Sequence, residues 1–296
     1  MPAEPDDRWT VGRLLNWTKD FLKKKGSESP RLDAEVLLAS VLACERVQLY
    51  TRYEDEVAEA PRGAFRDLVK RRADGAPVAY LVGRKEFYSL SFAVSPAVLI
   101  PRPDSEFVIV EALAKLKGID SPGCVDVGTG SGCLALACVH HHKTARFFAI
   151  DLSPEALAIA RRNASTLGLE SRVAFVEGDL LEPVRAGGPF DLILSNPPYI
   201  ASAVVATLEP GVRDFEPHLA LDGGEDGLRV VDRLIPQAVE LLRPGGHLIL
   251  EIGSDQEMSV RGLIAARREF ELAPTIRDAA NHPRVLCARR LADHEI

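Results

Sequence analysis

The tetrapeptide Asn196-Pro197-Pro198-Tyr199 has residue types that could hold a planar nitrogen group. It directly follows Phe190–Ser195, an apolar run typical of a buried strand. The Asn196 side-chain oxygen could accept one N–H hydrogen and the Pro197 carbonyl the other, because proline restricts the backbone that carries this carbonyl. Tyr199 could stack on the planar group. The motif therefore indicates chemistry at a nitrogen that bears two hydrogens, in an amide or an adenine.

A glycine-rich turn lies where another apolar strand ends. Gly128-Thr129-Gly130-Ser131-Gly132 follows Gly123–Val127, and ligands of open α/β sheets bind at the carboxyl ends of strands. Glycine lets the backbone turn tightly and approach a ligand closely. Position 133 is a cysteine, so the turn departs from the dinucleotide fingerprint, and it has no Lys-Ser/Thr for a nucleoside triphosphate. Taken alone, this turn indicates a ligand loop or an ordinary strand-to-helix connection equally well.

An acidic residue at the end of the next strand favours the ligand loop. Asp151 follows Arg146–Ile150, and its carboxylate could accept hydrogen bonds from two ribose hydroxyls. Its alternative role is to cap the helix that begins at Pro154, although Ser153 could provide that cap instead.

Two further carboxylates lie near the same predicted edge. Asp179 could accept a bond from an adenine amino group, while Leu180 would form an apolar wall for the ring. Asp126 lies inside an apolar strand and needs a partner, so it could tether the glycine turn or approach a ligand's ammonium group. These features predict an adenosine ligand without phosphates, and S-adenosylmethionine fits. The predicted cofactor residues are Gly128, Thr129, Gly130, Ser131, Gly132, Asp151, Asp179, Leu180 and Asn196.

The elements that position these residues alternate between helix and strand. We expect strands at 123–127, 146–150, 173–177, 190–195 and 247–252, and helices at 104–117, 154–167 and 228–242. Strands separated by helices predict a parallel sheet with helices on both faces. Residues 270–277 and 284–290 should pair as an antiparallel hairpin. The predicted fold class is α/β, with a mostly parallel sheet that ends in an antiparallel hairpin, and this arrangement resembles the seven-stranded sheet of class I methyltransferases.

The chain before this sheet has a different pattern. Helices are expected from the cap at Thr10, over 32–44 and over 62–72, and two short strands are expected around Ser95-Pro96. The run Ile100-Pro101-Arg102-Pro103 is rigid because each proline restricts itself and its predecessor. We therefore predict an N-terminal helical substrate-recognition domain (1–83), a linking β-hairpin (84–103) and a methyltransferase domain (104–296).

The composition bounds the class of protein. The 296 residues are 46% hydrophobic and carry a net charge of −7, which suits a soluble protein and argues mildly against stable nucleic-acid binding. The start, Met1–Trp9, does not have the pattern of a secretory signal, and no apolar run approaches the roughly 20 residues of a membrane span. The five scattered cysteines suit reduced thiols. A cytoplasmic protein without a membrane partner is expected.

Several other motifs are shared with one family: Pro30–Glu35, Gly75–Leu81, Glu86–Tyr88, Val98–Pro103 and, most specifically, Val212–Leu228. With Asn196–Tyr199, they make nearly the whole chain resemble the bacterial peptide chain release factor N5-glutamine methyltransferases. The resemblance implies methyl transfer from S-adenosylmethionine to the glutamine of the Gly-Gly-Gln motif in class-1 release factors. It also implies that the glycine turn, Asp151, Leu180 and Asn196–Tyr199 bind the ligands.

The site roles that follow are specific. Asn196, Pro197, Pro198 and Tyr199 are the expected catalytic and substrate-binding residues, with Phe87 and Arg102 as further substrate contacts. Arg102 could instead bridge domains, and Glu251 could support the site or serve as a structural acid. The sequence departs from the family in Pro103–Glu106, where Pro-Glu-Thr-Glu is commoner, and in the loop 278–284. One acid and one hydroxyl are retained in the first of these segments.

Other functions remain possible from the sequence. A ribosomal-protein glutamine, a DNA adenine N6 or a non-catalytic role would each use part of the same pattern. DNA methylation needs base flipping and a recognition domain, and the first 80 residues have few basic and aromatic residues for that. Cys133, Cys138 and His140–His142 could suggest a metal, but the two cysteines lie five positions apart and so do not align on one helix face, and no metal is expected.

Overall fold

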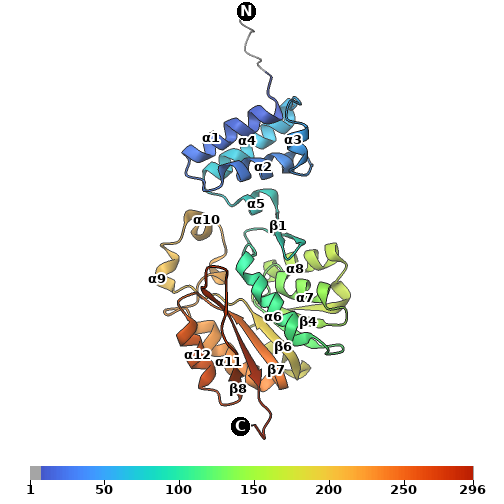
Figure 1. Ribbon diagram of the computed structural model, residues 1–296, viewed down its shortest axis with the longest axis vertical. Coiled ribbons are helices and arrows are strands. Elements are labelled where there is room, and N and C mark those ends of the chain that lie inside the picture. The colour runs from blue at the N-terminus through green and yellow to red at the C-terminus, as the bar shows by residue number, and fades with distance from the viewer. Residues whose placement is uncertain (1–7, 296) are drawn as a thin grey trace, which may run out of the picture. The chain divides into compact units, whose positions relative to one another are not determined.

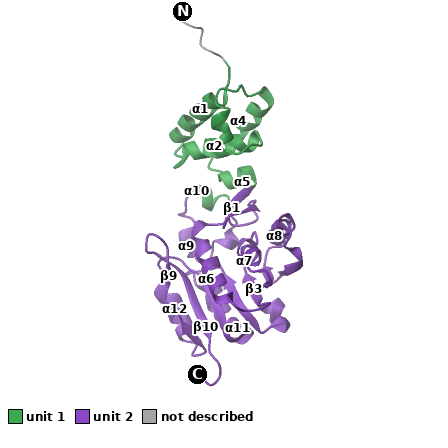
Figure 2. Cartoon of the chain, turned by 45° about the vertical axis from the view of Figure 1, so that its right-hand side comes forward, with its two compact units in different colours: residues 1–83, 210–215 green, residues 84–209, 216–296 purple. Residues whose placement is uncertain are grey.

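The computed structural model describes residues 8–295 and divides into two compact units (Figure 2). The first unit comprises the chain through Gly83 together with Pro210–Phe215, and the second comprises Arg84–Glu209 and the chain from Glu216 onward. The sequence assigned 210–215 to the methyltransferase domain, whereas this segment belongs to the first unit. Residues 1–7 and 296 lie outside the described residues. They include most of the Met1–Trp9 segment, the start of the predicted helical domain and the last residue of the predicted methyltransferase domain.

The first unit is helical. Its helices are α1 (Val11–Lys24), α2 (Pro30–Val41), α3 (Gln48–Thr51), α4 (Glu59–Ala73), α5 (Val78–Val82) and α10 (Pro210–Arg213). The Thr10 hydroxyl accepts a bond from the Arg13 amide at 3.2 Å, which confirms the predicted cap. Helix α2 begins two residues before the predicted start because Pro30 fits the first turn of a helix. The buried side chains of this unit include Leu14, Leu22, Leu37, Leu38, Phe65 and Val69.

The second unit contains a sheet in the order β5-β4-β3-β6-β7-β10-β8, with β9 also paired to β10 (Figure 1). The strands are β3 (Gly123–Val127), β4 (Arg146–Asp151), β5 (Val173–Glu177), β6 (Phe190–Ser195), β7 (Leu242–Glu251), β8 (Phe270–Leu272), β9 (Ile276–Arg277) and β10 (Pro283–Arg290). Strands β3 to β7 pair in parallel, and β10 is antiparallel to its neighbours. Short strands β8 and β9 follow one another along β10, so eight strands fill seven positions and the predicted fold class is confirmed.

Helices cover both faces of this sheet. They are α6 (Glu106–Leu116), α7 (Cys133–His141), α8 (Pro154–Leu167), α11 (Arg229–Leu241) and α12 (Glu257–Ala265), with shorter turns η1 (Pro103–Ser105), η2 (Glu170–Arg172), η3 (Glu182–Gly187), α9 (Ser202–Val205) and η4 (His218–Ala220). Cys124 belongs to the cluster that contains α6 and α7, and Val125 to the cluster that contains α11 and α12. Because successive strand residues point to opposite faces, both faces are apolar and buried.

The linking hairpin differs from its prediction. Its strands are β1 (Arg84–Phe87) and β2 (Leu90–Ala93), and they turn at Tyr88-Ser89 instead of around Ser95-Pro96. Tyr88 and Ser89 have φ values of 48° and 61°, a backbone region that favours glycine and asparagine. The sequence therefore lacks the usual turn signal at this place. The Tyr88 amide is held by the Glu106 carboxylate at 2.9 Å.

Among the helices of residues 8–295, none combines the length and the apolar character that crossing a bilayer requires.

Candidate active site

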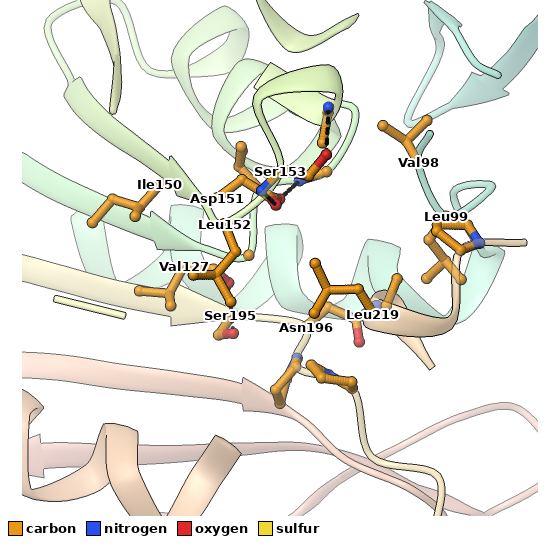
Figure 3. A pocket seen from close by; sticks show the side chains of 18 of the residues that line it. Val98, Leu99, Val127, Ile150, Asp151, Leu152, Ser153, Ser195, Asn196 and Leu219 are labelled. Atoms are coloured by element: carbon orange, nitrogen blue, oxygen red, sulfur yellow. Dashed lines mark hydrogen bonds between the residues drawn. The ribbon is translucent and has the colours of Figure 1, made fainter. Parts of the chain in front are cut away.

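A cavity of about 400 Å³ opens at the carboxyl ends of the central strands (Figure 3). Strand ends contribute Val127 from β3, Ile150 and Asp151 from β4, and Ser195 from β6. Parallel strands bring their carboxyl ends to one edge, so residues far apart in the chain meet there. The cavity thus lies where the sequence placed both candidate sites.

The glycine turn lines one side of this cavity through Gly128, Thr129, Gly130 and Ser131. The amides of Gly128 and Thr129 both donate to the Ile150 carbonyl at 2.9 Å, which fixes the turn against β4. Gly128 and Gly130 have φ values of 71° and 55°, and a Cβ at either would meet no atom within 4 Å. The backbone of this turn is therefore exposed to the cavity.

Gly132 has a different role from the rest of the turn. It is not a lining residue, and a Cβ there would lie 3.0 Å from Leu136 Cδ1 and 3.2 Å from Ala160 Cβ. Its φ of 79° is also unfavourable for other residues. Gly132 therefore serves the close packing of α7 against α8, and the structure does not bring it to the cavity as the sequence analysis expected.

Asp126, a buried residue of β3, is hydrogen-bonded to the glycine turn. Its Oδ2 accepts from Thr129 Oγ1 at 2.6 Å and from the Ala135 amide at 3.2 Å, and its side chain is fully buried. Burial raises the pKa of Asp126 to about 7. Because Asp126 does not line the cavity, the geometry favours the tether over a contact with a ligand's ammonium group.

Asp151 faces both the turn and the cavity. Its Oδ2 accepts from the Gly130 amide at 2.8 Å and its Oδ1 from the Ser153 amide at 2.9 Å. Ser153 Oγ in turn accepts from the Ala156 amide at 3.0 Å, so Ser153 is the helix cap. Burial raises the pKa of the Asp151 carboxyl. Each carboxylate oxygen can accept more than one hydrogen bond, so Asp151 retains capacity for hydroxyl donors in the cavity.

Asp179 and Leu180 follow β5 and line the cavity. The Asp179 carboxylate forms an ion pair with Arg233, and its side chain is 41% exposed. Leu180 is buried with a φ of 51°. Leu180 therefore supplies the apolar wall that the sequence predicted, while a donor from a ligand would share Asp179 with Arg233.

Asn196 lines the cavity and is held there by a polar contact of its own. Its Nδ2 donates to Ser105 Oγ at 3.1 Å, and Pro197 and Pro198 line the cavity beside it. Tyr199 is not a lining residue, and burial raises the pKa of its phenol to about 12. Its backbone carbonyl accepts from Gln256 Nε2 at 2.9 Å, which holds the motif in place.

Of the two substrate contacts predicted in the linking segment, Arg102 lines the cavity and Phe87 does not. Phe87 is 2% exposed and packs edge-to-face on Phe92, with ring centroids 6.2 Å apart, so it is a core residue and does not reach the cavity. The structure therefore does not bring Phe87 to the cavity, because β1 turns its side chain into the core, and its predicted contact with the substrate stays a prediction. Arg102 does line the cavity, where it bonds Glu216 Oε1 at 2.5 Å.

Sequence reasoning missed several apolar walls. Val98, Leu99 and Leu219 face the cavity (Figure 3). Leu219 comes from the loop after the Asn-Pro-Pro-Tyr motif, far from the other two residues in sequence. Val98 and Leu99 directly precede the proline-rich joint, which was the available signal.

The cysteines that could suggest a metal site are buried thiols that stay protonated at neutral pH. Burial raises the pKa of Cys133 to about 12 and raises that of Cys138 as well, whereas metals bind the thiolate. No group of three or more potential ligands is assembled within the part of the chain that the structure describes.

Comparison with known proteins defines the class first. The family model "Methyltransferase small domain" matches residues 106–209, and "PrmC N-terminal domain" matches residues 13–83. A solved methyltransferase from Pyrococcus furiosus is 18% identical, with a TM-score of 0.52, and the match covers 75% of this chain and 98% of that chain. The second unit therefore contains the segment that matches the methyltransferase model, and it shares its fold with the Pyrococcus structure.

Relatives with similarity along the whole chain define the family. A release factor glutamine methyltransferase from Rhodopirellula baltica is 43% identical over 96% of this chain and 98% of its own length. One from Moorella thermoacetica is 46% identical over 95% of this chain and 99% of its own length. This protein belongs to the release factor glutamine methyltransferase family.

Proposed function

We propose that this enzyme transfers a methyl group from S-adenosylmethionine to the side-chain amide nitrogen, N5, of the glutamine in the Gly-Gly-Gln motif of class-1 peptide chain release factors. The carrying observation is the position of Asn196: its NH₂ is bonded to Ser105, at a cavity whose other side is the glycine turn. Relatives matched over nearly their full length are named for this activity. The names do not support ribosomal-protein or DNA methylation.

The cavity fits S-adenosylmethionine in the types of group it presents. Exposed backbone at Gly128 and Gly130 allows close approach, Asp151 offers acceptors for ribose hydroxyls, and Leu180 offers an apolar wall for adenine. When bound, this cofactor supplies a sulfonium methyl that is already activated for transfer. The turn and Asp151 would hold and orient it.

The chain's own groups would act on the amide nitrogen. An amide nitrogen is a poor nucleophile because its lone pair is delocalised into the carbonyl. Asn196 Oδ1 and the Pro197 carbonyl would accept its two N–H hydrogens and aim the lone pair. As conjugation is lost these hydrogens become more acidic, so both acceptors would bind the transition state more tightly than the ground state. Tyr199 does not line the cavity, so in this proposal it acts by holding the segment through the bond between its carbonyl and Gln256.

Mass spectrometry of a purified class-1 release factor, after incubation with the enzyme and S-adenosylmethionine, tests the proposal. We expect one added methyl on the Gly-Gly-Gln glutamine. A release factor with that glutamine changed to glutamate is the matched control and should stay unmodified. Duplex DNA and ribosomal proteins are incubated in parallel, and methylation of either in place of the release factor would overturn the assignment.

The division of the chain suggests separate tasks. We assign cofactor binding and chemistry to residues 104–296, linkage to 84–103, and recognition of the release factor to the helical residues 1–83. The match of residues 13–83 to a domain model of this family supports that assignment. Since the substrate acts in translation, a cytoplasmic site of action accords with the proposal, and neither a metal nor stable nucleic-acid binding enters it.

A further inference from the structure

Asn196 is held by a partly buried polar contact between segments far apart in sequence. Its Nδ2 lies 3.1 Å from the Oγ of Ser105, which is 91 positions earlier in the chain and 2% exposed. Ser105 ends the turn η1 that leads into α6, whereas Asn196 directly follows β6. Both residues line the cavity.

A third member of the contact comes from β7. Ser195 pairs with Leu250 in the parallel β6–β7 register, which places Glu251 beside Asn196. Glu251 is 2% exposed, and its Oε2 has no hydrogen-bond partner among residues 8–295. Burial raises the pKa of Glu251 to about 7, and hydrogen bonds with Ser105 and Asn196 act in the opposite direction.

The donors and acceptors of these three side chains determine which end of the Asn196 carboxamide faces Ser105. An ionised carboxylate only accepts hydrogen bonds, a serine hydroxyl accepts and donates, and a carboxamide has a donating and an accepting end. With Glu251 as an acceptor, Ser105 donates to it and must therefore accept from its other neighbour. That neighbour must present its NH₂, so the Nδ2 of Asn196 faces Ser105 and Oδ1 is left for the cavity.

We propose that Ser105 and Glu251 are positioning residues that fix the carboxamide of Asn196 with its oxygen toward the methyl acceptor. This inference rests on the proposed function, because only an acceptor with N–H hydrogens requires that orientation. A reversed carboxamide would present its own N–H groups to the substrate N–H groups and its oxygen to the Glu251 carboxylate, and neither pair forms a hydrogen bond. Ser105 could donate to the reversed oxygen only by giving up its bond to Glu251.

Removing the Ser105 hydroxyl is the direct test. We expect Ser105→Ala to lower kcat about 10- to 100-fold, the scale seen when a group that orients a ligand-contacting residue is lost. The KM for the release factor and the calorimetric Kd for S-adenosylmethionine should change less than about threefold. Ser105→Thr keeps the hydroxyl and should retain kcat within about threefold. Wild-type kcat in Ser105→Ala, or equal losses in the alanine and threonine variants, would overturn the inference.

A matched control separates positioning from loss of any buried hydroxyl. Thr18 is fully buried in α1, and its hydroxyl has no partner in the described part of the chain. Thr18→Val should leave kcat and the calorimetric Kd for S-adenosylmethionine unchanged. If it lowers kcat as much as Ser105→Ala does, the effect is general destabilisation and the proposal fails.

The pH dependence tests Glu251. The charged and titratable groups that face it are Asp104 from η1, Cys133 from α7, Arg284 from β10 and Tyr199. As pH falls through 7, Glu251 gains a proton, becomes a possible donor and no longer dictates the direction. We expect kcat to fall on this acid limb, and Glu251→Gln to have a lower kcat without the limb. An unchanged limb in Glu251→Gln would assign the titration elsewhere and remove Glu251 from the network.

A readout independent of turnover keeps this inference separate from the proposed function. In protein labelled with ¹⁵N-asparagine, the side-chain NH₂ of Asn196 is identified by its loss in Asn196→Ala. We expect its hydrogens to exchange slowly with water in the wild type. The exchange rate should rise at least tenfold in Ser105→Ala and should stay at the wild-type value in Ser105→Thr. Fast exchange in the wild type would overturn the network. An enzyme that methylates no release factor but shows this pattern would refute the proposed function alone.

Discussion

Two buried carboxyl groups, Asp126 and Glu251, support opposite sides of the same cavity. Both have a pKa raised to about 7 by burial, and each has one oxygen without a hydrogen-bond partner in the described chain. Asp126 binds Thr129 and the amide of Ala135, which are close in sequence, whereas Glu251 acts on Ser105 and Asn196 from distant segments. The side that we propose for the cofactor is thus a local structure, and the side that we propose for the methyl acceptor forms only once the sheet has assembled.

The largest effect should come from the acceptor side. Asn196→Ala should fold and bind the cofactor, yet lose roughly 10²–10³ in kcat, the scale of one lost preorganised contact. Stopped assays of methylated release factor give kcat, and calorimetry gives the cofactor Kd. Near-normal turnover would remove Asn196 from the chemistry and with it the distinction between the two sides.

The unfolding free energy should depend on pH because both carboxyls are buried. A carboxyl with a raised folded pKa stabilises the protein below its unfolded pKa, and this contribution is lost as pH rises through the folded value near 7. Asp126→Asn should therefore reduce the loss of unfolding free energy between pH 5 and pH 8 by on the order of 2–4 kcal/mol. Urea unfolding at both pH values measures it. An identical pH slope in the variant would contradict the assigned ionisation.

A smaller effect is expected on the cofactor side. Asp151→Ala should weaken S-adenosylmethionine binding by about 1.5–3 kcal/mol, the scale of hydrogen bonds to a charged group. Calorimetry measures this directly, and Ser153→Ala serves as the control because it removes the helix cap and a neighbouring hydroxyl but leaves the Asp151 carboxylate in place. Equal Kd values for the wild type and Asp151→Ala would show that Asp151 orders the turn without touching the ligand.

The smallest predicted effect concerns the link between the hairpin and the glycine turn. Buried Asn163 donates to the carbonyls of Ala93 and Ser131 at 3.0 and 2.9 Å and accepts from the Ala93 amide at 2.7 Å. Asn163→Ala leaves these backbone groups unpaired and should lower the unfolding free energy by about 1–3 kcal/mol. Amide hydrogen exchange should quicken first at Ala93. Unaltered exchange there would show that the hairpin is held by its apolar contacts alone.

The sequence predicted the parallel strands well and the acceptor side poorly. Strands β3, β5 and β6 match their expected bounds because apolar runs there are bounded by glycine, aspartate or asparagine. The contact between Ser105 and Asn196 could not be predicted, since it depends on how strands and helices pack and not on local pattern.

Other errors share a physical cause. The hairpin turn was misplaced because Tyr88 and Ser89 adopt positive φ without the residues that favour it. The pattern around Phe87 also does not show which way its side chain points, and the structure buries it against Phe92. The segment 210–215 packs with the first unit, where Phe215 lies 3.6 Å from the Cβ position of Gly75. Nothing in its local pattern indicates that neighbour.

The thiols described as poor metal ligands have a practical consequence. Burial raises the pKa of Cys124, Cys133, Cys138 and Cys287, so mild alkylation at neutral pH would find few thiolates in the methyltransferase domain. The remaining cysteine, Cys44, is only partly buried and belongs to the helical unit. A single fluorophore could therefore be attached there without mutating the protein, and would report when that unit meets a release factor.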